Sequence, residues 1–188
     1  MKTRHIDQTE MQARVARFKQ LDPLPATATL DMPQAAKDVI YSRTLLSVIG
    51  LEDTTTPINQ GAPIIGAGGI TMTHAVCPPG TGPSLHAHRN TYETFTVMRG
   101  RFELYWNDDG GERIELDEFD TISVPPGVCR GFRNIDDEDG ILQVIISGGV
   151  HDMQDIDYPK TTAEQLAEFG EDVVQQFEQR GMTFTAGT

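Results

Sequence analysis

The sequence predicts an all-β domain, an antiparallel barrel or sandwich, with helical extensions at both ends. The middle of the chain is divided into short β-rich segments, and turn signals separate them at Pro78-Pro79-Gly80, Asn107–Gly111 and Pro125-Pro126-Gly127. Short strands at this spacing are typical of an antiparallel sandwich or barrel. The predicted strands are Thr44–Ile49, Gly69–Cys77, Tyr92–Met98, Arg101–Trp106, Glu112–Leu116, Thr121–Val124 and Ile141–Ser147.

The clearest local pairing in this set is a hairpin with its tip at Asn107–Gly111, a run of Asn, Asp and Gly that favours a tight turn. On the strand that precedes it, Phe102, Leu104 and Trp106 alternate with polar neighbours. Because successive side chains of a strand point to opposite faces, these three share one face, which we expect to pack in the core.

The N-terminal segment has helical periodicity. Met11, Val15 and Phe18 fall on one face, and Asp7 with Glu10 resembles a capping pair before them. We expect this helix to end at Asp22-Pro23, because proline cannot continue a helix.

The C-terminal segment predicts a second helix that starts at Thr161, with Glu164 completing a capping box, and stops at Gly181. Gly170 is expected to divide it. Its apolar stripe consists of Leu166, Phe169, Val173 and Phe177. A short helix is also predicted around Gln34–Tyr41. Amphipathic helices at the ends must cover either the outside of their own barrel or a second subunit.

Composition limits the functional classes. The chain has 188 residues, a net charge of −13 and a sequence pI of about 4.6. A nucleic-acid or anionic-membrane partner needs a basic surface, so we expect neither. Residues 1–20 are polar and charged, unlike a secretory signal. Two cysteines, Cys77 and Cys129, do not make a disulfide framework, and we interpret both as packed, reduced thiols in a cytoplasmic protein.

The strongest chemical signal is His86-Ala87-His88 followed by Glu93. Two histidines separated by one residue point the same way from an extended strand. A carboxylate five residues later can return to the same pocket if the chain turns in between. Two imidazoles and a carboxylate form a common ligand set for a divalent transition metal.

The full spacing around these residues resembles the first motif of the cupin superfamily: Gly80, then His86-Ala87-His88, Glu93 and Gly100. Val124–Asn134 resembles the second motif, with its Pro-x-Gly and final Asn in place. Two positions depart from the pattern. Phe119 stands where the pattern has glycine, and Arg130 stands where it has histidine. The resemblance covers residues 60 to 148.

The resemblance implies a cupin-type antiparallel β-barrel, also called a double-stranded β-helix or jelly roll. It also implies three parts: an N-terminal extension over residues 1–58, a barrel over 59–150 and a helical tail over 151–188. A homodimer is expected, since many cupins pair through barrel faces or exchanged end segments. A small barrel leaves a mouth for a small-molecule ligand.

The resemblance further implies that His86, His88 and Glu93 bind Fe, Mn, Ni or Zn. The expected function is a mononuclear non-haem dioxygenase that acts on a small anionic aromatic or dicarbonyl compound. Arg130 keeps its charge and cannot ligate a metal. At about 5 Å and an effective dielectric near 20, it repels a divalent ion by roughly 6–7 kcal/mol. Such a pocket needs an anion, so we expect Arg130 to orient an anionic substrate, and we count Arg130 and Glu93 as candidate catalytic residues.

Several alternatives stay open at this stage. The histidines can line the barrel without a metal, Arg130 can pair with Glu103 or Asp120, and His74 can replace the missing ligand if it faces inward. The protein can instead be an isomerase or epimerase with Glu93 or a histidine as base, or a small-molecule-binding cupin without turnover. Three aromatic residues are expected to fill the core rather than line the cavity. They are Tyr92, Phe95 and Trp106.

Overall fold

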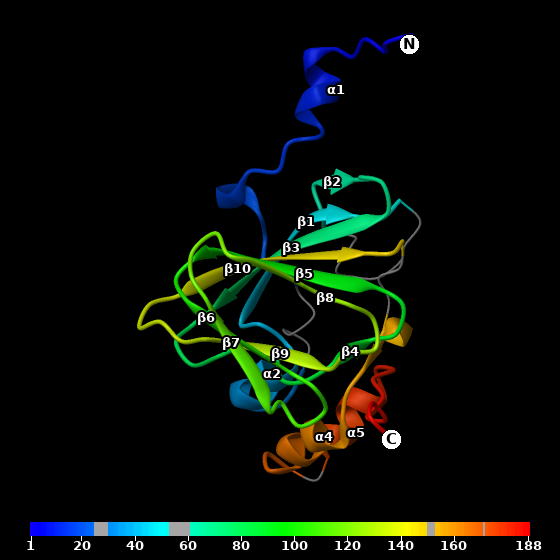
Figure 1. Ribbon diagram of the computed structural model, residues 1–188. Coiled ribbons are helices and arrows are strands. Elements are labelled where there is room, and N and C mark those ends of the chain that lie inside the picture. Colours follow the sequence, from blue (N-terminus) through cyan, green and yellow to red (C-terminus); the bar gives the residue numbers. More distant parts are fainter. Residues whose placement is uncertain (25–29, 53–60, 150–152, 171) are drawn as a thin grey trace.

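A computed structural model of the chain describes residues 1–24, 30–52, 61–149, 153–170 and 172–188. Two β-sheets face each other, a group of helices lies below them, and an N-terminal arm extends away from the other end (Figure 1). The strands are β1 (Thr44–Gly50), β2 (Ile64–Ile65), β3 (Ile70–Cys77), β4 (Ala87–His88), β5 (Tyr92–Arg99), β6 (Phe102–Trp106), β7 (Glu112–Leu116), β8 (Thr121–Val124), β9 (Arg130–Asn134), β10 (Gly140–Ser147) and β11 (Ile156–Asp157).

The larger sheet has six strands in the order β2-β1-β3-β10-β5-β8, and the opposing sheet has the order β7-β6-β9. Strands β11 and β4 form a separate antiparallel pair. Apart from β1 with β2, the pairs between these strands are antiparallel. The all-β prediction with a double-stranded β-helix arrangement is therefore confirmed, although the two sheets do not close into one continuous barrel.

The main core lies between the sheets and is built from the inward residues of β3 and of β5 to β10. Phe102 and Leu104 are buried and Trp106 packs against the same cluster, as their alternation predicted. The hairpin at Asn107–Gly111 is also confirmed, since β6 pairs with β7 across it. Phe95 is fully buried, whereas Tyr92 is exposed, so the core prediction for Tyr92 is wrong. Its place at the outward position of β5 explains this.

The seven predicted strands are present with small shifts at their ends. Strands β2, β4, β9 and β11 were not among the predicted segments. Three of them are two residues long, and β9 carries Arg130, Gly131 and Arg133, which weaken its β-strand pattern.

The helical segments are α1 (Gln8–Gln12), η1 (Phe18–Gln20), α2 (Gln34–Ile40), η3 (Met153–Asp155), α4 (Lys160–Ala167) and α5 (Val173–Glu178). The capping box of Asp7 and Glu10 is present on α1. The predicted continuation to Asp22-Pro23 is wrong, because α1 ends at Gln12. Met11 and Val15 are exposed, and a short helix without tertiary packing is marginal.

At the other end, Gly170 separates α4 from α5 as predicted. The capping box at Thr161 is wrong, because α4 begins one residue earlier with Pro159 at its N-cap. Leu166, Val173 and Phe177 are buried, whereas Phe169 is partly exposed. The helix pair therefore buries most of the predicted stripe.

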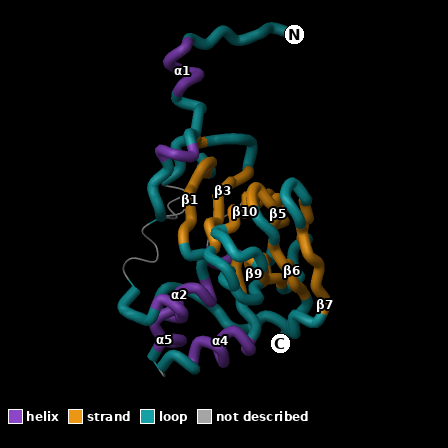
Figure 2. Tube along the Cα trace, turned by 90° about the vertical axis from the view of Figure 1, so that its left-hand side faces the viewer, coloured by secondary structure: helices purple, strands orange, loops and turns teal. Residues whose placement is uncertain are grey.

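These C-terminal helices pack on their own chain. Figure 2 shows α4 and α5 grouped with α2 beneath the strands. A second apolar core joins them and consists of Leu30, Ala36, Val39, Ile40, Tyr158, Leu166, Val173, Phe177 and Met182. The short helix predicted around Gln34–Tyr41 thus exists and forms a common layer with the tail. Among the described residues, no helix combines the length and apolarity needed to cross a bilayer.

Phe119 shows how the structure accommodates one departure from the cupin pattern. It has a φ of 72° in the turn between β7 and β8, a conformation that favours glycine, and its side chain is 72% exposed. A bulky residue in this region is strained and here gains little from packing.

We expect Phe119→Gly to raise the free energy of unfolding by about 1 kcal/mol, because glycine adopts positive φ without a Cβ clash. Urea denaturation of wild type and variant measures this. Phe119→Ala is the control: it removes the same ring but keeps the strain. If both variants shift stability equally, the gain comes from loss of the exposed ring and not from the backbone.

Candidate metal centre

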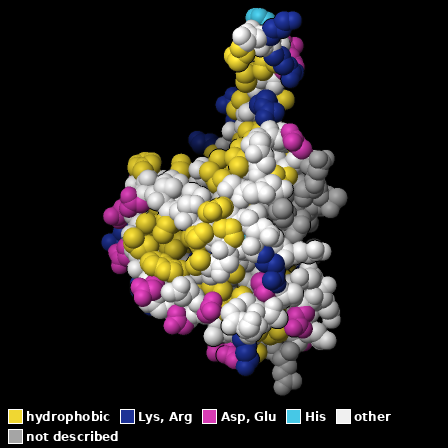
Figure 3. Space-filling view, turned by 45° about the vertical axis from the view of Figure 1, so that its right-hand side comes forward, with side chains coloured by type: hydrophobic (Ala, Val, Ile, Leu, Met, Phe, Trp, Pro, Cys, Tyr) yellow, Lys and Arg dark blue, Asp and Glu magenta, His cyan; other side chains and the backbone are white. Residues whose placement is uncertain are grey.

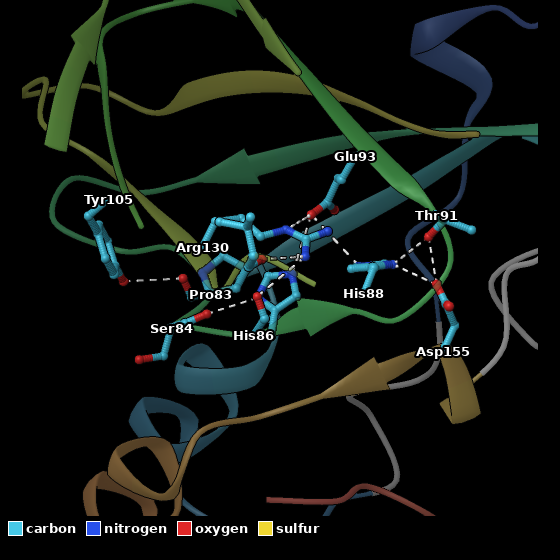
Figure 4. Close-up of polar contacts among 10 residues, drawn as sticks. Pro83, Ser84, His86, His88, Thr91, Glu93, Tyr105, Arg130 and Asp155 are labelled. Carbon is cyan, nitrogen blue, oxygen red and sulfur yellow. Dashed lines mark hydrogen bonds and ion pairs between the residues drawn. The ribbon is translucent and has the colours of Figure 1, made fainter. Parts of the chain in front are cut away.

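Three buried side chains meet at one end of the core. His86 directly precedes β4, His88 lies on β4, and Glu93 begins the inward row of β5. Glu93 Oε2 lies 3.4 Å from His86 Nε2 and 3.8 Å from His88 Nε2. One donor atom from each residue falls within 4.8 Å of the others, so this group can hold a metal ion. Figure 4 shows the three side chains pointing toward one another.

The outer nitrogens of both imidazoles are already engaged. His86 Nδ1 lies 2.9 Å from the carbonyl oxygen of Ser84, which can only accept, so Nδ1 carries the proton. His88 Nδ1 lies 3.1 Å from Asp155 Oδ2 and 2.9 Å from Thr91 Oγ1. A histidine whose Nδ1–H is donated outward presents the Nε2 lone pair inward, as metal-binding histidines do.

The local electrostatics favour a cation at this point. Burial lowers the pKa of His88, which keeps the ring neutral. Burial would raise the pKa of Glu93, but the positive charge of Arg130, together with contacts to the two histidines, outweighs it and holds the pKa well below its usual range. Imidazole lone pairs therefore face an ionised carboxylate at short range. A divalent cation bound by all three would remove this repulsion, so the donor set fits a metal.

Asp155 is a site residue that sequence reasoning missed. It is buried at the end of η3, and it accepts hydrogen bonds from Thr91 Oγ1 (2.6 Å) and from the backbone N–H of Asn90 (2.8 Å) as well as from His88. Burial raises its pKa, yet these hydrogen bonds prevail and hold the pKa well below its usual value. Asp155 lies 67 residues after His88 in the sequence, so no local motif indicates that the two residues are partners.

Arg130 is fully buried on β9 and pairs with Glu93, its Nε lying 2.8 Å from Oε2. Its Nη1 makes longer contacts with the carbonyl oxygens of His86 and Val128. Its Nη2 is buried, and within the described part of the chain no hydrogen-bond acceptor is in reach of it. Nη2 is thus the guanidinium nitrogen that remains able to donate to a bound anion.

The predicted alternative partners of Arg130 are wrong. Glu103 pairs with Arg133 and Arg113 on the outside of the smaller sheet. Asp120 accepts a hydrogen bond from a backbone N–H in its own turn. Strand β9 points Arg130 inward instead, and its backbone hydrogen bonds with His86, 2.9 Å in each direction, bring the two sequence motifs together.

His74 does not supply a further ligand. Its neighbours Thr73 and Ala75 line the interior, so alternation along β3 places His74 on the outer face, where its ring packs edge-on against Phe18 with centroids 5.7 Å apart. The alternative that His74 replaces the missing ligand is therefore wrong.

Cys77 and Cys129 are buried, and burial raises the pKa of each thiol to about 12, in keeping with packing roles.

A cavity of about 100 Å³ opens beside the three candidate ligands. Its walls are mostly apolar and come from both sheets, from the end of α2 and from the C-terminal tail. Its lining consists of Ile40, Tyr41, Ser42, Leu45, Thr73, Ala75, Pro83, His86, His88, Glu93, Phe132, Val144, Ile146, Ile156 and Tyr158. A small molecule with an apolar body and one coordinating group suits this space.

Comparison with known families assigns the fold. Residues 73–146 match the cupin domain family, and this segment contains the three candidate ligands and Arg130. The matched segment is a cupin domain. The matched segment spans β3 to β10, which are the elements that build the cupin core and the site.

Several solved structures are similar to this chain at low sequence identity. One is a conserved protein with a double-stranded β-helix domain from Klebsiella pneumoniae (23% identity, TM-score 0.41, 44% of this chain and 70% of that one). Another is a predicted oxalate decarboxylase from Thermotoga maritima (19%, 0.38, 41% and 64%). A third is the Cnp3 cupin domain of Schizosaccharomyces pombe (13%, 0.42, 68% and 80%). Comparison with curated proteins gives no match.

We expect Asp155→Asn to weaken metal binding by about 10- to 100-fold, because a neutral amide no longer fixes the His88 tautomer and orientation. Titration calorimetry with Zn²⁺ and Mn²⁺ measures the affinity. Asp172→Asn, an exposed aspartate of the same tail, is the matched control. Equal affinities for wild type and Asp155→Asn would contradict the assigned role of Asp155.

Proposed function

We propose that this cupin is a metal-dependent enzyme in which His86, His88 and Glu93 hold a divalent Fe, Mn, Ni or Zn ion. The observation that supports this most directly is the convergence of two imidazole Nε2 atoms on one carboxylate oxygen while both Nδ1 atoms are engaged elsewhere. A histidine pair held only for packing has no need of this orientation.

The proposed reaction is the oxygenation of a small anionic aromatic or dicarbonyl compound. When bound, the metal would supply Lewis acidity toward a carboxylate or enolate and, as Fe(II), electrons for reaction with dioxygen. Two neutral imidazoles and one carboxylate leave a divalent metal with net positive charge, and Arg130 adds to it. An anionic substrate therefore complements this pocket.

The chain's own residues would orient the substrate and exclude water. The apolar walls at Leu45, Val144 and Ile146 leave little room for solvent beside a bound molecule. Tyr41 and Tyr158 also line the cavity, and burial raises the pKa of both phenols, so their hydroxyls stay protonated. Arg130 fixes Glu93 through Nε and can offer Nη2 to the acid group.

A second candidate function rests on the ion pair between Arg130 and Glu93. The guanidinium already balances the buried carboxylate, so the pocket has a charge-neutral arrangement without a metal. In that case the site would act as an isomerase or epimerase, with Arg130 stabilising an enolate. Because the low pKa of Glu93 makes it a weak base, His86 would be the better proton acceptor.

The metal content of the purified protein distinguishes the metal-dependent enzyme from the metal-free isomerase or epimerase. We expect elemental mass spectrometry of tag-free wild type to show near-stoichiometric transition metal, and His86→Ala to lose it. Arg130→His should bind metal at least tenfold more tightly, because it removes a repelling charge and adds an imidazole. Arg133→His makes the same exchange on the exposed side of β9 and should change nothing. If wild type binds no metal even after reconstitution with Fe, Mn, Ni and Zn, the oxygenase proposal is contradicted.

Oxygen uptake tests the reaction class. We expect Fe(II)-loaded wild type to consume dioxygen with at least one member of a panel of small 1,3-dicarbonyls and single-ring aromatic acids, and His86→Ala to consume none. Deuterium incorporation from solvent without oxygen uptake would contradict oxygenation and favour the isomerase. Thermal stabilisation by a panel member without turnover would favour a binding module.

A further inference from the structure

A buried hydroxyl at the far end of the cavity has no hydrogen-bond partner. Ser42 lies between α2 and β1, lines the cavity and is 2% exposed. Within the described part of the chain, its Oγ makes no hydrogen bond. Burying a hydroxyl without a partner is unfavourable, so an unpaired one in a native structure calls for an explanation, such as a ligand that completes it.

The backbone that carries Ser42 is held on both sides. The guanidinium of the next residue, Arg43, binds the carboxylate of Asp38, with 2.9 Å between Nε and Oδ1. Before Ser42, the carbonyl oxygen of Val39 accepts a hydrogen bond of 2.7 Å from the backbone N–H of Ser84. This bond fixes the end of α2 against the loop that precedes β4. The hydroxyl is therefore positioned in advance, which is what a selective polar contact requires.

The Cys77 thiol lies beside Ser42 but does not satisfy its hydroxyl. Burial raises the pKa of this thiol to about 12, and the contact with Ser42 acts in the opposite direction. A thiol is a weak donor and a weak acceptor. The Ser42 O–H therefore keeps its capacity to donate to a stronger acceptor, such as a carbonyl oxygen.

The register of the larger sheet separates Ser42 from the candidate metal centre. Glu93 of β5 is level, across β10, with Thr71 of β3. Leu45, which follows Ser42 by three residues, is level with Ala75 of β3. Thr71 and Ala75 are four residues apart, or roughly 14 Å at about 3.4 Å per residue. The cavity therefore has two polar ends. The side chains that line the Ser42 end with it carry no polar atom and are Leu45, Ala75, Pro83 and Phe132.

The surroundings favour a neutral acceptor at the Ser42 end over a second carboxylate. The described lining contains no lysine or arginine, and Arg43 is directed to Asp38 instead. The whole chain has a net charge of −13, and Figure 3 shows Asp and Glu side chains on the displayed face of the body. A second negative charge on the ligand would be repelled by this field and would find no ion pair at this end of the cavity.

We propose that Ser42 determines specificity by donating a hydrogen bond to a neutral carbonyl oxygen at one end of the substrate, while the acid group at the other end lies at the candidate metal centre. The inference rests on the proposed function for the acid end only. It narrows the substrate to a singly charged acid that carries a carbonyl group beyond a short apolar segment. A molecule without this carbonyl would leave the buried hydroxyl unpaired, and such sites discriminate strongly against it.

Three small acids of matched shape test this assignment. Levulinate ends in an acetyl group, isocaproate has a methyl group in place of the carbonyl oxygen, and succinate has a charged oxygen in place of the acetyl methyl. Each is used together with its homologues that are one and two carbons longer. NMR titration of the Zn²⁺-loaded full chain measures the dissociation constants, and Zn²⁺ is chosen because it has no redox chemistry. At the chain length that fits best, we expect the keto acid to bind at least fivefold more tightly than either matched acid.

Variants of Ser42 assign this preference to the hydroxyl. Ser42→Ala should abolish the preference for the keto acid without weakening the branched acid, and Ser42→Thr, which keeps a hydroxyl, should retain it. Ser47→Ala is the matched control, because Ser47 is a buried serine of β1 that is not among the described lining residues. Thermal unfolding without ligand gives a second readout. Ser42→Ala should be at least as stable as wild type, because alanine leaves no unpaired polar group.

The proposal is overturned if wild type shows no keto preference at any chain length, if the preference survives Ser42→Ala, or if Ser42→Ala unfolds at a clearly lower temperature. Removing the metal separates this test from that of the proposed function. If metal-free protein binds every acid as tightly as the Zn²⁺-loaded protein, coordination of the acid by a metal is contradicted. A keto preference that persists in that protein still supports the role of Ser42.

Discussion

The buried carboxylate of Glu93 is the constraint around which the candidate site is organised. An ionised group at this depth is costly unless positive charge or hydrogen-bond donors surround it. Arg130 meets part of this need through Nε, and the two imidazoles face the same oxygen. The metal-binding and metal-free interpretations differ only in which cation balances Glu93. The geometry of the histidines favours a metal, because both Nδ1 atoms are engaged outward.

The C-terminal tail is part of this site and not merely an appendage of the barrel. Asp155 holds His88, and two residues later Asp157 accepts hydrogen bonds from Arg89, Thr183 and Thr185. Strand β11, which follows Asp155 and includes Asp157, pairs with β4, and β4 carries His88. The tail thereby fixes the strand that presents the candidate ligand His88, so folding of the tail and formation of the site are coupled.

The sequence was sufficient for features that depend on local patterns. Strand alternation located the β-segments, and the spacing of His86, His88 and Glu93 located the candidate ligands. Contacts between distant segments were out of reach. Nothing near Arg130 indicates Glu93 as its partner rather than Glu103, and nothing near Asp155 indicates His88. The N-terminal helix was overestimated because its periodicity indicates an amphipathic face but not whether that face is covered in the monomer. Met11 and Val15 are exposed in the structure, and a helix without a packed face is held only by its cap.

The construction of the cavity limits what the protein can accept. Its lining draws on β-strands from both sheets, on Ile40 at the end of α2, and on Ile156 and Tyr158 of the C-terminal tail. Ile40 and Tyr158 belong to the second core, together with Leu166 and Phe177. Enlarging the cavity on this side would therefore expose a buried apolar cluster, which costs about 25 cal/mol for each Å² uncovered. The second core closes this side of the cavity, so the size of the cavity follows from the same packing that stabilises the tail.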